Sequence, residues 1–131
     1  MGEPGVHSGK VAAEYLHINS GTAAIPTATV RLRFADGMLQ GAAIGDGPVD
    51  AACRAISAVT KTAAKLEKYE IRAVTSGTEA MGEVTMLLEL DGQKVLGRSA
   101  STDVIEASAR AYIDALNKLA HFASKRPAVG D

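Results

Sequence analysis

The sequence is short of the features that mark several classes of protein. It has 131 residues, no tryptophan, and only 4% aromatic residues. Its single cysteine, Cys53, excludes an internal disulfide framework and is typical of a reducing compartment, so we expect a cytoplasmic protein. The 14 basic and 15 acidic residues nearly cancel, which favours neither a nucleic-acid nor a membrane-surface partner. No apolar run approaches the roughly 18 residues that a membrane span requires.

What the sequence does contain is an internal repeat. Gly21-Thr22 recurs as Gly77-Thr78, and Asp50-Ala51-x-x-Arg54-Ala55 recurs as Glu106-Ala107-x-x-Arg110-Ala111, both 56 residues later (77 − 21 and 106 − 50). Asp36-Gly37 is matched by Asp91-Gly92, one residue out of register. A period of this size is typical of two copies of one supersecondary unit, neither of which can bury its apolar face alone. The sequence therefore predicts a pseudo-twofold domain.

The pattern within each copy predicts three strands and a helix. In the first copy we expect strands at 15–18, 27–34 and 38–44, a loop at 20–26 and a helix at 48–66. In the second we expect strands at 69–75, 83–90 and 93–99, a loop at 76–82 and a helix at 104–122. Asp36-Gly37 and Asp91-Gly92 are typical hairpin turns, and Asp103 with Glu106 resembles a capping box.

This order predicts an α+β fold with antiparallel strands and two helices packed on the sheet. We expect residues 1–13 to be a tail or linker stub and residues 123–131 to be a second tail. Between them, we expect one domain at 14–122, divided into units at 14–68 and 69–122. The abundance of alanine in both expected helices leaves little volume per residue in the core, which favours self-association.

Few side chains suggest catalysis. His7, His17 and His121 have no ligand spacing, and Cys53 falls on the apolar side of the first helix, where a buried, inert thiol is expected. Asp50 and Glu106 could form a carboxylate pair. The repeat explains them better, because each lies in a first helical turn, four residues before an arginine.

The best candidate for function is Gly45-Asp46-Gly47-Pro48, where a strand meets a helix. Two glycines there leave backbone N–H groups accessible at the positive end of a helix, which suits a carboxylate. A plain turn explains the same residues equally well. The lysine and hydroxyl residue of a phosphate loop are missing.

At these residues the chain closely resembles the C-terminal regulatory domain of 2-isopropylmalate synthases, over about residues 15–119. The matching stretches are Gly45 to Ala52, Ala73 to Val84 and Ser101 to Tyr112. The related citramalate synthases share the domain, but the second and third stretches are more similar to the isopropylmalate branch.

The resemblance implies a homodimeric allosteric domain that binds L-leucine near the pseudo-twofold interface and feedback-inhibits a separate TIM-barrel catalytic domain. That domain condenses acetyl-CoA with 2-oxoisovalerate, using a divalent metal, in leucine biosynthesis. This chain alone would hold no catalytic residue, metal or cofactor. The implied leucine-binding residues are Gly45, Gly47, Val49, Asp50, Leu66, Tyr69, Ala73, Ala80 and Val104.

Three alternatives stay open at this stage. The domain could belong to a citramalate synthase and bind isoleucine, since one methylene separates such ligands by only roughly 1–3 kcal/mol. It could be a structural dimerisation domain without a ligand. A small free-standing enzyme is the third, for which no nucleophile–base pair is evident.

Overall fold

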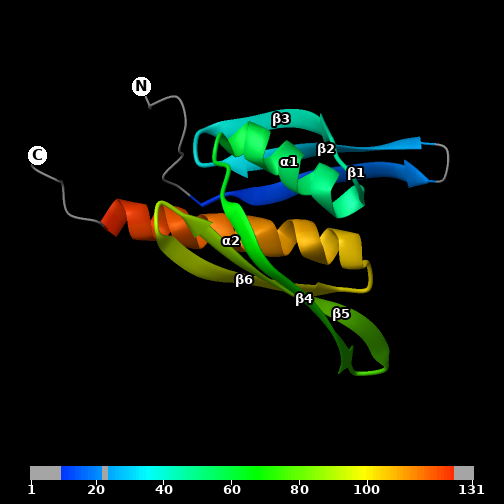
Figure 1. Ribbon diagram of the computed structural model, residues 1–131. Coiled ribbons are helices and arrows are strands. Elements are labelled where there is room, and N and C mark those ends of the chain that lie inside the picture. The colour runs from blue at the N-terminus through cyan, green and yellow to red at the C-terminus, as the bar shows by residue number, and fades with distance from the viewer. Residues whose placement is uncertain (1–9, 22–23, 126–131) are drawn as a thin grey trace, which may run out of the picture.

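The computed structural model describes residues 10–21 and 24–125 and shows a βββα unit twice (Figure 1). One antiparallel sheet has the strand order β1-β2-β3 and the other β4-β5-β6, and each is followed by a helix. The α+β fold and the repeated unit are therefore confirmed. The elements are β1 (Ala12–Gly21), β2 (Ala24–Phe34), β3 (Gly37–Ile44), α1 (Pro48–Thr60), β4 (Lys65–Ser76), β5 (Glu79–Leu90), β6 (Gln93–Ser101) and α2 (Val104–Lys125).

Several expected boundaries were wrong. The helix α1 ends at Thr60 rather than at residue 66, because Lys61 takes a left-handed conformation (φ 56°) and its N–H donates to the Ser57 carbonyl. Leu66, expected at the end of the helix, lies instead in β4. The expected loop at 76–82 is only the turn Gly77-Thr78, so that Ala80 belongs to β5.

The segments expected to be tails are partly ordered. The first strand starts at Ala12, and α2 continues to Lys125. Lys10 and Val11 are also described, whereas residues 1–9, including His7, and residues 126–131 lie outside the described residues.

The core forms between each sheet and its own helix. Alternate residues of β2 and β5 are fully buried, and they are equivalent in the repeat: Val30 with Met86, and Leu32 with Leu88. The helix α1 packs on β2 and β3, and α2 packs on β5 and β6. The two helices also contact each other.

Glycines in the third strand of each unit allow the helices to approach closely. A Cβ at Gly41 would lie 2.5 Å from the Val59 Cγ2 atom, and one at Gly97 would overlap the Ala111 carbonyl oxygen. These glycines are 56 residues apart, so the repeat preserves the close approach as well as the strands. Helices rich in alanine suit this spacing, because a larger side chain would separate the helix from the sheet.

The first strands of the two units share a β-bulge. Glu14 is left out of the pairing between β1 and β2, and Glu67 is left out of the pairing between β4 and β5. A bulge bends and twists its strand and re-aims the neighbouring side chains. Its presence in both units extends the repeat to a detail that the sequence does not show.

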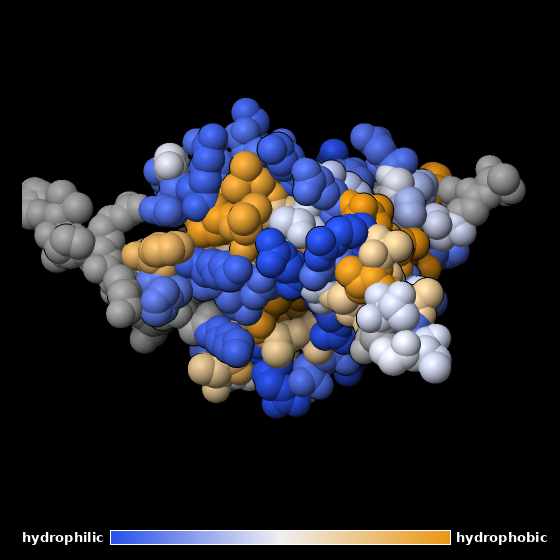
Figure 2. Space-filling model, turned by 90° about the horizontal axis from the view of Figure 1, so that it is seen from below, coloured by the Kyte–Doolittle hydropathy of each residue, from blue (hydrophilic) through white to orange (hydrophobic). Residues whose placement is uncertain are grey.

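The two first strands differ in what covers them. Among the described elements, β1 is approached by both helices, whereas β4 has close backbone neighbours only in β5. Leu66, Tyr69 and Ile71 are 45%, 36% and 52% exposed. Figure 1 shows the β4–β5 hairpin extending away from the helices, and Figure 2 shows apolar surface among the charged side chains of the same side.

Candidate functional site

The loop before α1 leaves the first turn of the helix without a capping side chain. The Gly45 amide donates to the Pro26 carbonyl (3.0 Å), and a Cβ on Gly45 would overlap the backbone of Asp50 and Ala51. Gly47 caps the helix in an extended conformation without a side-chain cap, and nothing lies within 4 Å of where its Cβ would be. The start of α1 is therefore not covered by a capping side chain.

Asp50 organises this helix start. Its Oδ2 atom accepts hydrogen bonds from the Asp46 amide (2.8 Å) and from the Arg54 Nε atom (2.8 Å). The expected ion pair within the helix is thus confirmed, as is its counterpart between Glu106 and Arg110 (2.9 Å). Placing a carboxylate in the first turn also stabilises the positive end of the helix.

The capping box at α2 forms only in part. The Asp103 Oδ1 atom accepts from the amides of Ile105 and Glu106 (2.9 and 3.3 Å), as expected for a cap. The Glu106 carboxylate does not reach back, because it pairs with Arg110, and the Asp103 amide donates instead to the Ser101 Oγ atom.

A groove of about 870 Å³ lies between α1 and β4 and is called the first groove below. Its residues come from α1, from the segment that follows it, from β4 and from one position of α2. They are Val49, Asp50, Cys53, Arg54, Ser57, Ala58, Lys61, Thr62, Ala63, Ala64, Leu66, Tyr69 and Tyr112.

Four of the nine sequence-predicted residues line this groove: Val49, Asp50, Leu66 and Tyr69. Gly45 and Gly47 lie in the loop just before it. The structure places the other three towards the β4–β5 hairpin. There Ala73 pairs with Gly82, and a Cβ on Gly82 would lie 2.7 Å from the Val104 Cγ2 atom. Ala80 follows the same alternation along β5 as Gly82.

Two tyrosines of the first groove form hydrogen bonds with serine hydroxyl groups of the helices. The Tyr69 hydroxyl lies 2.6 Å from the Ser108 Oγ atom, which itself donates to the Val104 carbonyl (2.8 Å), so the tyrosine is the donor. The Tyr112 hydroxyl lies 2.6 Å from the Ser57 Oγ atom and connects α2 to α1. Sequence reasoning missed Tyr112 and Ser57 as groove residues, because helical periodicity does not tell which faces of two helices meet.

Cys53 lines the groove as a protonated thiol. Burial, with a smaller effect from the Asp50 carboxylate, raises the pKa of Cys53 to about 12. A thiol with this pKa is a poor nucleophile at neutral pH, as the sequence predicted.

The described histidines, which were the other candidates for catalysis or metal binding, lie in different elements. His17 stacks on Tyr15 in β1, and His121 lies near the end of α2 beside Phe122. Among the residues that the structure describes, no three His, Cys, Asp or Glu side chains are grouped as a metal site would require. Neither helix in the described ranges is long and apolar enough to cross a membrane.

Comparison with known proteins identifies relatives of the whole domain. A family model described as the LeuA allosteric (dimerisation) domain matches residues 2–120. The chain is 52% identical over 106 residues to a 2-isopropylmalate synthase of Heliobacterium modesticaldum and 50% identical over 107 residues to one of Pelotomaculum thermopropionicum. A 2-isopropylmalate synthase of Gloeobacter violaceus is 46% identical over 115 residues. These matches cover 81–87% of this chain but only 21% of each relative, so the chain spans about one fifth of their length.

Proposed function

Because this chain belongs to the LeuA allosteric (dimerisation) domain family, we propose that it is the regulatory domain of a 2-isopropylmalate synthase. In this proposal it pairs with a second copy and binds L-leucine, which inhibits a catalytic domain of the same polypeptide. That catalytic domain would hold the divalent metal and condense acetyl-CoA with 2-oxoisovalerate in the cytoplasm. The observation that carries the proposal is an apolar groove beside an uncapped helix start.

The first groove suits both ends of a leucine molecule. Pro48 has no N–H, and among the described residues the amides of Val49 and Asp50 have no backbone acceptor, so they can donate to a carboxylate. Asp50 Oδ1 or a loop carbonyl can accept from the ammonium group. Val49, Leu66 and the tyrosine rings offer an apolar surface to the isobutyl group.

The β4 strand supports the proposed dimer. Its apolar side chains Leu66, Tyr69 and Ile71 lie on the sheet face that carries α2 and are still exposed in one chain. A second copy placed on this face would bury them, and it would close a groove that is too open in one chain to hold a small amino acid. It would also bring Ala73, Ala80 and Val104 into the same enclosed region.

Calorimetric titration with L-leucine tests the ligand. We expect saturable heat and an increase in melting temperature, both lost in Gly47→Asp, because the new carboxylate would repel the ligand at the helix start. The structure leaves open space for that side chain, so the variant should fold. Gly47→Asn is the matched control for size without charge. No heat and no thermal shift at millimolar leucine would contradict leucine binding.

The remaining alternatives are outcomes of the same titration. A preference for isoleucine over leucine would favour the citramalate branch. A stable dimer that responds to neither amino acid would favour a purely structural dimerisation domain.

A further inference from the structure

A second groove lies between β1 and α2 and is the internal counterpart of the first. Moving 56 residues along the chain takes Val49, Asp50 and Arg54 of the first groove to Ile105, Glu106 and Arg110 of the second. The strands correspond as well, because Leu16 lies opposite Val30 as Tyr69 lies opposite Met86. Each groove therefore combines the helix of one unit with the first strand of the other.

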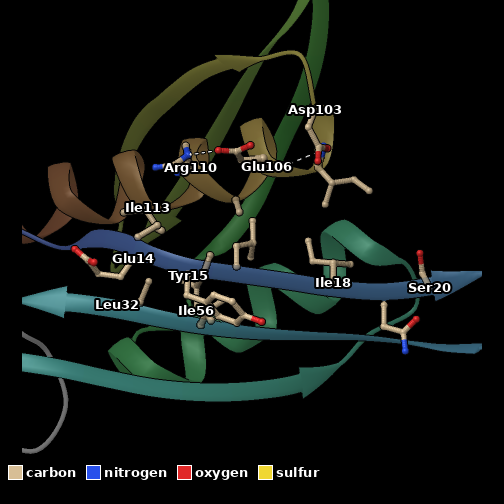
Figure 3. Close-up of a pocket in the computed structure, with 16 residues that line it drawn as sticks. Glu14, Tyr15, Ile18, Ser20, Leu32, Ile56, Asp103, Glu106, Arg110 and Ile113 are labelled. Atoms are coloured by element: carbon tan, nitrogen blue, oxygen red, sulfur yellow. Dashed lines mark hydrogen bonds and ion pairs between the residues drawn. The ribbon is translucent and has the colours of Figure 1, made fainter.

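The floor of the second groove is apolar and its volume is about 400 Å³, within the range of small-molecule sites. Leu16 and Ile18 of β1 and Ile105, Ala109 and Ile113 of α2 contribute to it. In Figure 3, Ile113 points from α2 towards β1, which contributes Glu14, Ile18 and Ser20, and the paired Glu106 and Arg110 side chains lie along α2 at the edge of the groove.

The rim of the groove carries both signs of charge. Glu14, Asp103 and Glu106 are carboxylates, and Arg110 is a cation. A hydrogen bond from Arg33 (2.6 Å) lowers the pKa of Glu14, so that carboxylate stays ionised at neutral pH. Glu106 pairs with Arg110 through its Oε2 atom, and within the described chain its Oε1 atom has no partner.

This rim differs from its counterpart in one way that matters for recognition. In the first groove, Asp50 is held by the Asp46 amide as well as by Arg54. The Glu106 side chain is one methylene longer than that of Asp50, and it accepts a hydrogen bond only from the Arg110 guanidinium. It can therefore turn its second carboxylate oxygen towards the groove. Asp103 likewise uses only its Oδ1 atom to cap α2.

From this geometry we propose that the second groove is a separate binding site for a small apolar α-amino acid. The ammonium group of the ligand lies against Glu106 and Asp103, its carboxylate against Arg110, and its aliphatic side chain on the floor formed by β1 and α2. The site shares no lining residue with the first groove, so it rests on the proposed function only for the class of ligand.

Residue-resolved NMR titration of the ¹⁵N-labelled protein separates the two grooves. L-Leucine should shift the amide signals of Leu16, Ile18 and Ala109 in a saturable way. 4-Methylpentanoate, which lacks the ammonium group, should shift them at least tenfold more weakly. If the carboxylic acid alone binds equally well, or if these signals do not move with millimolar leucine, isoleucine or valine, the proposal is wrong.

Equivalent substitutions in the two grooves supply the controls. Glu106→Gln should weaken the shifts in the second groove at least tenfold, and Ile105→Trp should abolish them by filling it. Asp50→Asn and Val49→Trp, at the corresponding positions of the first groove, should change the affinity of the second groove for leucine by no more than about twofold. Unchanged binding in Glu106→Gln and Ile105→Trp would overturn the proposal, and a melting curve confirms that each variant is folded.

The two proposals fail separately in this titration. Shifts confined to the first groove would support leucine sensing and overturn the second site. Shifts confined to the second groove would support the second site and contradict the proposed function of the first.

Discussion

At the scale of single residues, local chemistry was predictable where it depends on close neighbours in the sequence. The ion pairs of Asp50 with Arg54 and of Glu106 with Arg110 follow from spacing alone, since residues four apart share a helix face. The Tyr112–Ser57 contact joins two helices and could not be predicted, because no local pattern reports which helix faces meet.

The first residue-scale prediction concerns the Cys53 thiol. Its pKa is about 12 in the folded protein and near 9 ordinarily, so the unfolded chain loses this proton first as pH rises. The free energy of unfolding should therefore fall between about pH 9 and pH 12. Urea titrations across this range should show a steeper fall for the wild type than for Cys53→Ala; parallel curves would contradict the shift.

The same thiol should resist labelling. At pH 8 we expect a disulfide reagent such as 5,5′-dithiobis(2-nitrobenzoate) to modify Cys53 far more slowly in the folded protein than in 6 M guanidinium chloride, because the thiolate is the reacting form. Equal rates would show that the thiol is accessible and ionised.

A third residue-scale prediction concerns Gly97. A Cβ there would overlap the Ala111 carbonyl oxygen and lie 2.7 Å from Ala115, so α2 would have to move away from β6. We expect Gly97→Ala to lower the unfolding free energy by about 1–3 kcal/mol, measured by chemical denaturation. Lys94→Ala, at an exposed position of the same strand, should change it by less than about 0.5 kcal/mol.

At the scale of elements, hydrophobic alternation predicted the central strands, and the Asp-Gly pairs predicted the two hairpins. The second turn is Asp91-Gly92 as expected, but the first is Ala35-Asp36, because Gly37 already pairs with Phe34 as the first residue of β3. It did not predict where α1 stops. Ala63 and Leu66 continue the helical spacing, but Lys61 adopts φ 56° and β4 starts at Lys65. Apolar residues beyond a helix end can keep its period by chance, and the pairing of β4 with β5 then decides the structure.

The two helix starts differ in their caps, and this difference can be measured. Asp103 accepts two amide hydrogen bonds at the start of α2, whereas Gly47 offers no side chain at α1. We expect Asp103→Ala to destabilise the domain by about 1 kcal/mol and Asp103→Asn to retain most of the stability. Chemical denaturation of both variants measures the effect, and equal losses would mean that charge rather than capping is responsible.

At the scale of the whole molecule, the repeat predicted two equivalent units but not how they meet. The structure joins them through the contact between α1 and α2, which includes the Ser57–Tyr112 hydrogen bond. The predicted site residues also divide at this scale. Val49, Asp50, Leu66 and Tyr69 line one groove, whereas Ala73, Ala80 and Val104 lie apart from it in a single chain. Sequence similarity suggests candidate site residues one by one and does not say which of them the fold brings together.

Removing the hydroxyl contact between the helices should weaken the joint between units. Tyr112→Phe leaves the half-buried Ser57 hydroxyl without its partner, and we expect a loss of about 0.5–1.5 kcal/mol in unfolding free energy. The double variant Ser57→Ala with Tyr112→Phe should recover part of that loss, because neither polar group is then left unpaired. Additive losses in this cycle would contradict a direct interaction.

Assembly gives a test at the same scale. Ile71→Lys places a charge on the exposed apolar face of β4, and we expect it to shift a dimer towards monomer in light scattering while circular dichroism is unchanged. Glu70→Lys, on the opposite face of the same strand, is the matched control. If both variants remain dimeric, this face is not the interface.

Each groove combines the helix of one unit with the first strand of the other, and this arrangement has a consequence for how the fold could have arisen. A half-length ancestor with one βββα unit could have made such a groove only by pairing with an identical chain, and that pair would have carried two identical copies. Duplication and fusion of such a unit would leave each copy free to diverge. The two units of this chain differ in this way, because Ser57 and Tyr112 form a hydrogen bond at positions equivalent to the apolar pair Ile113 and Ile56.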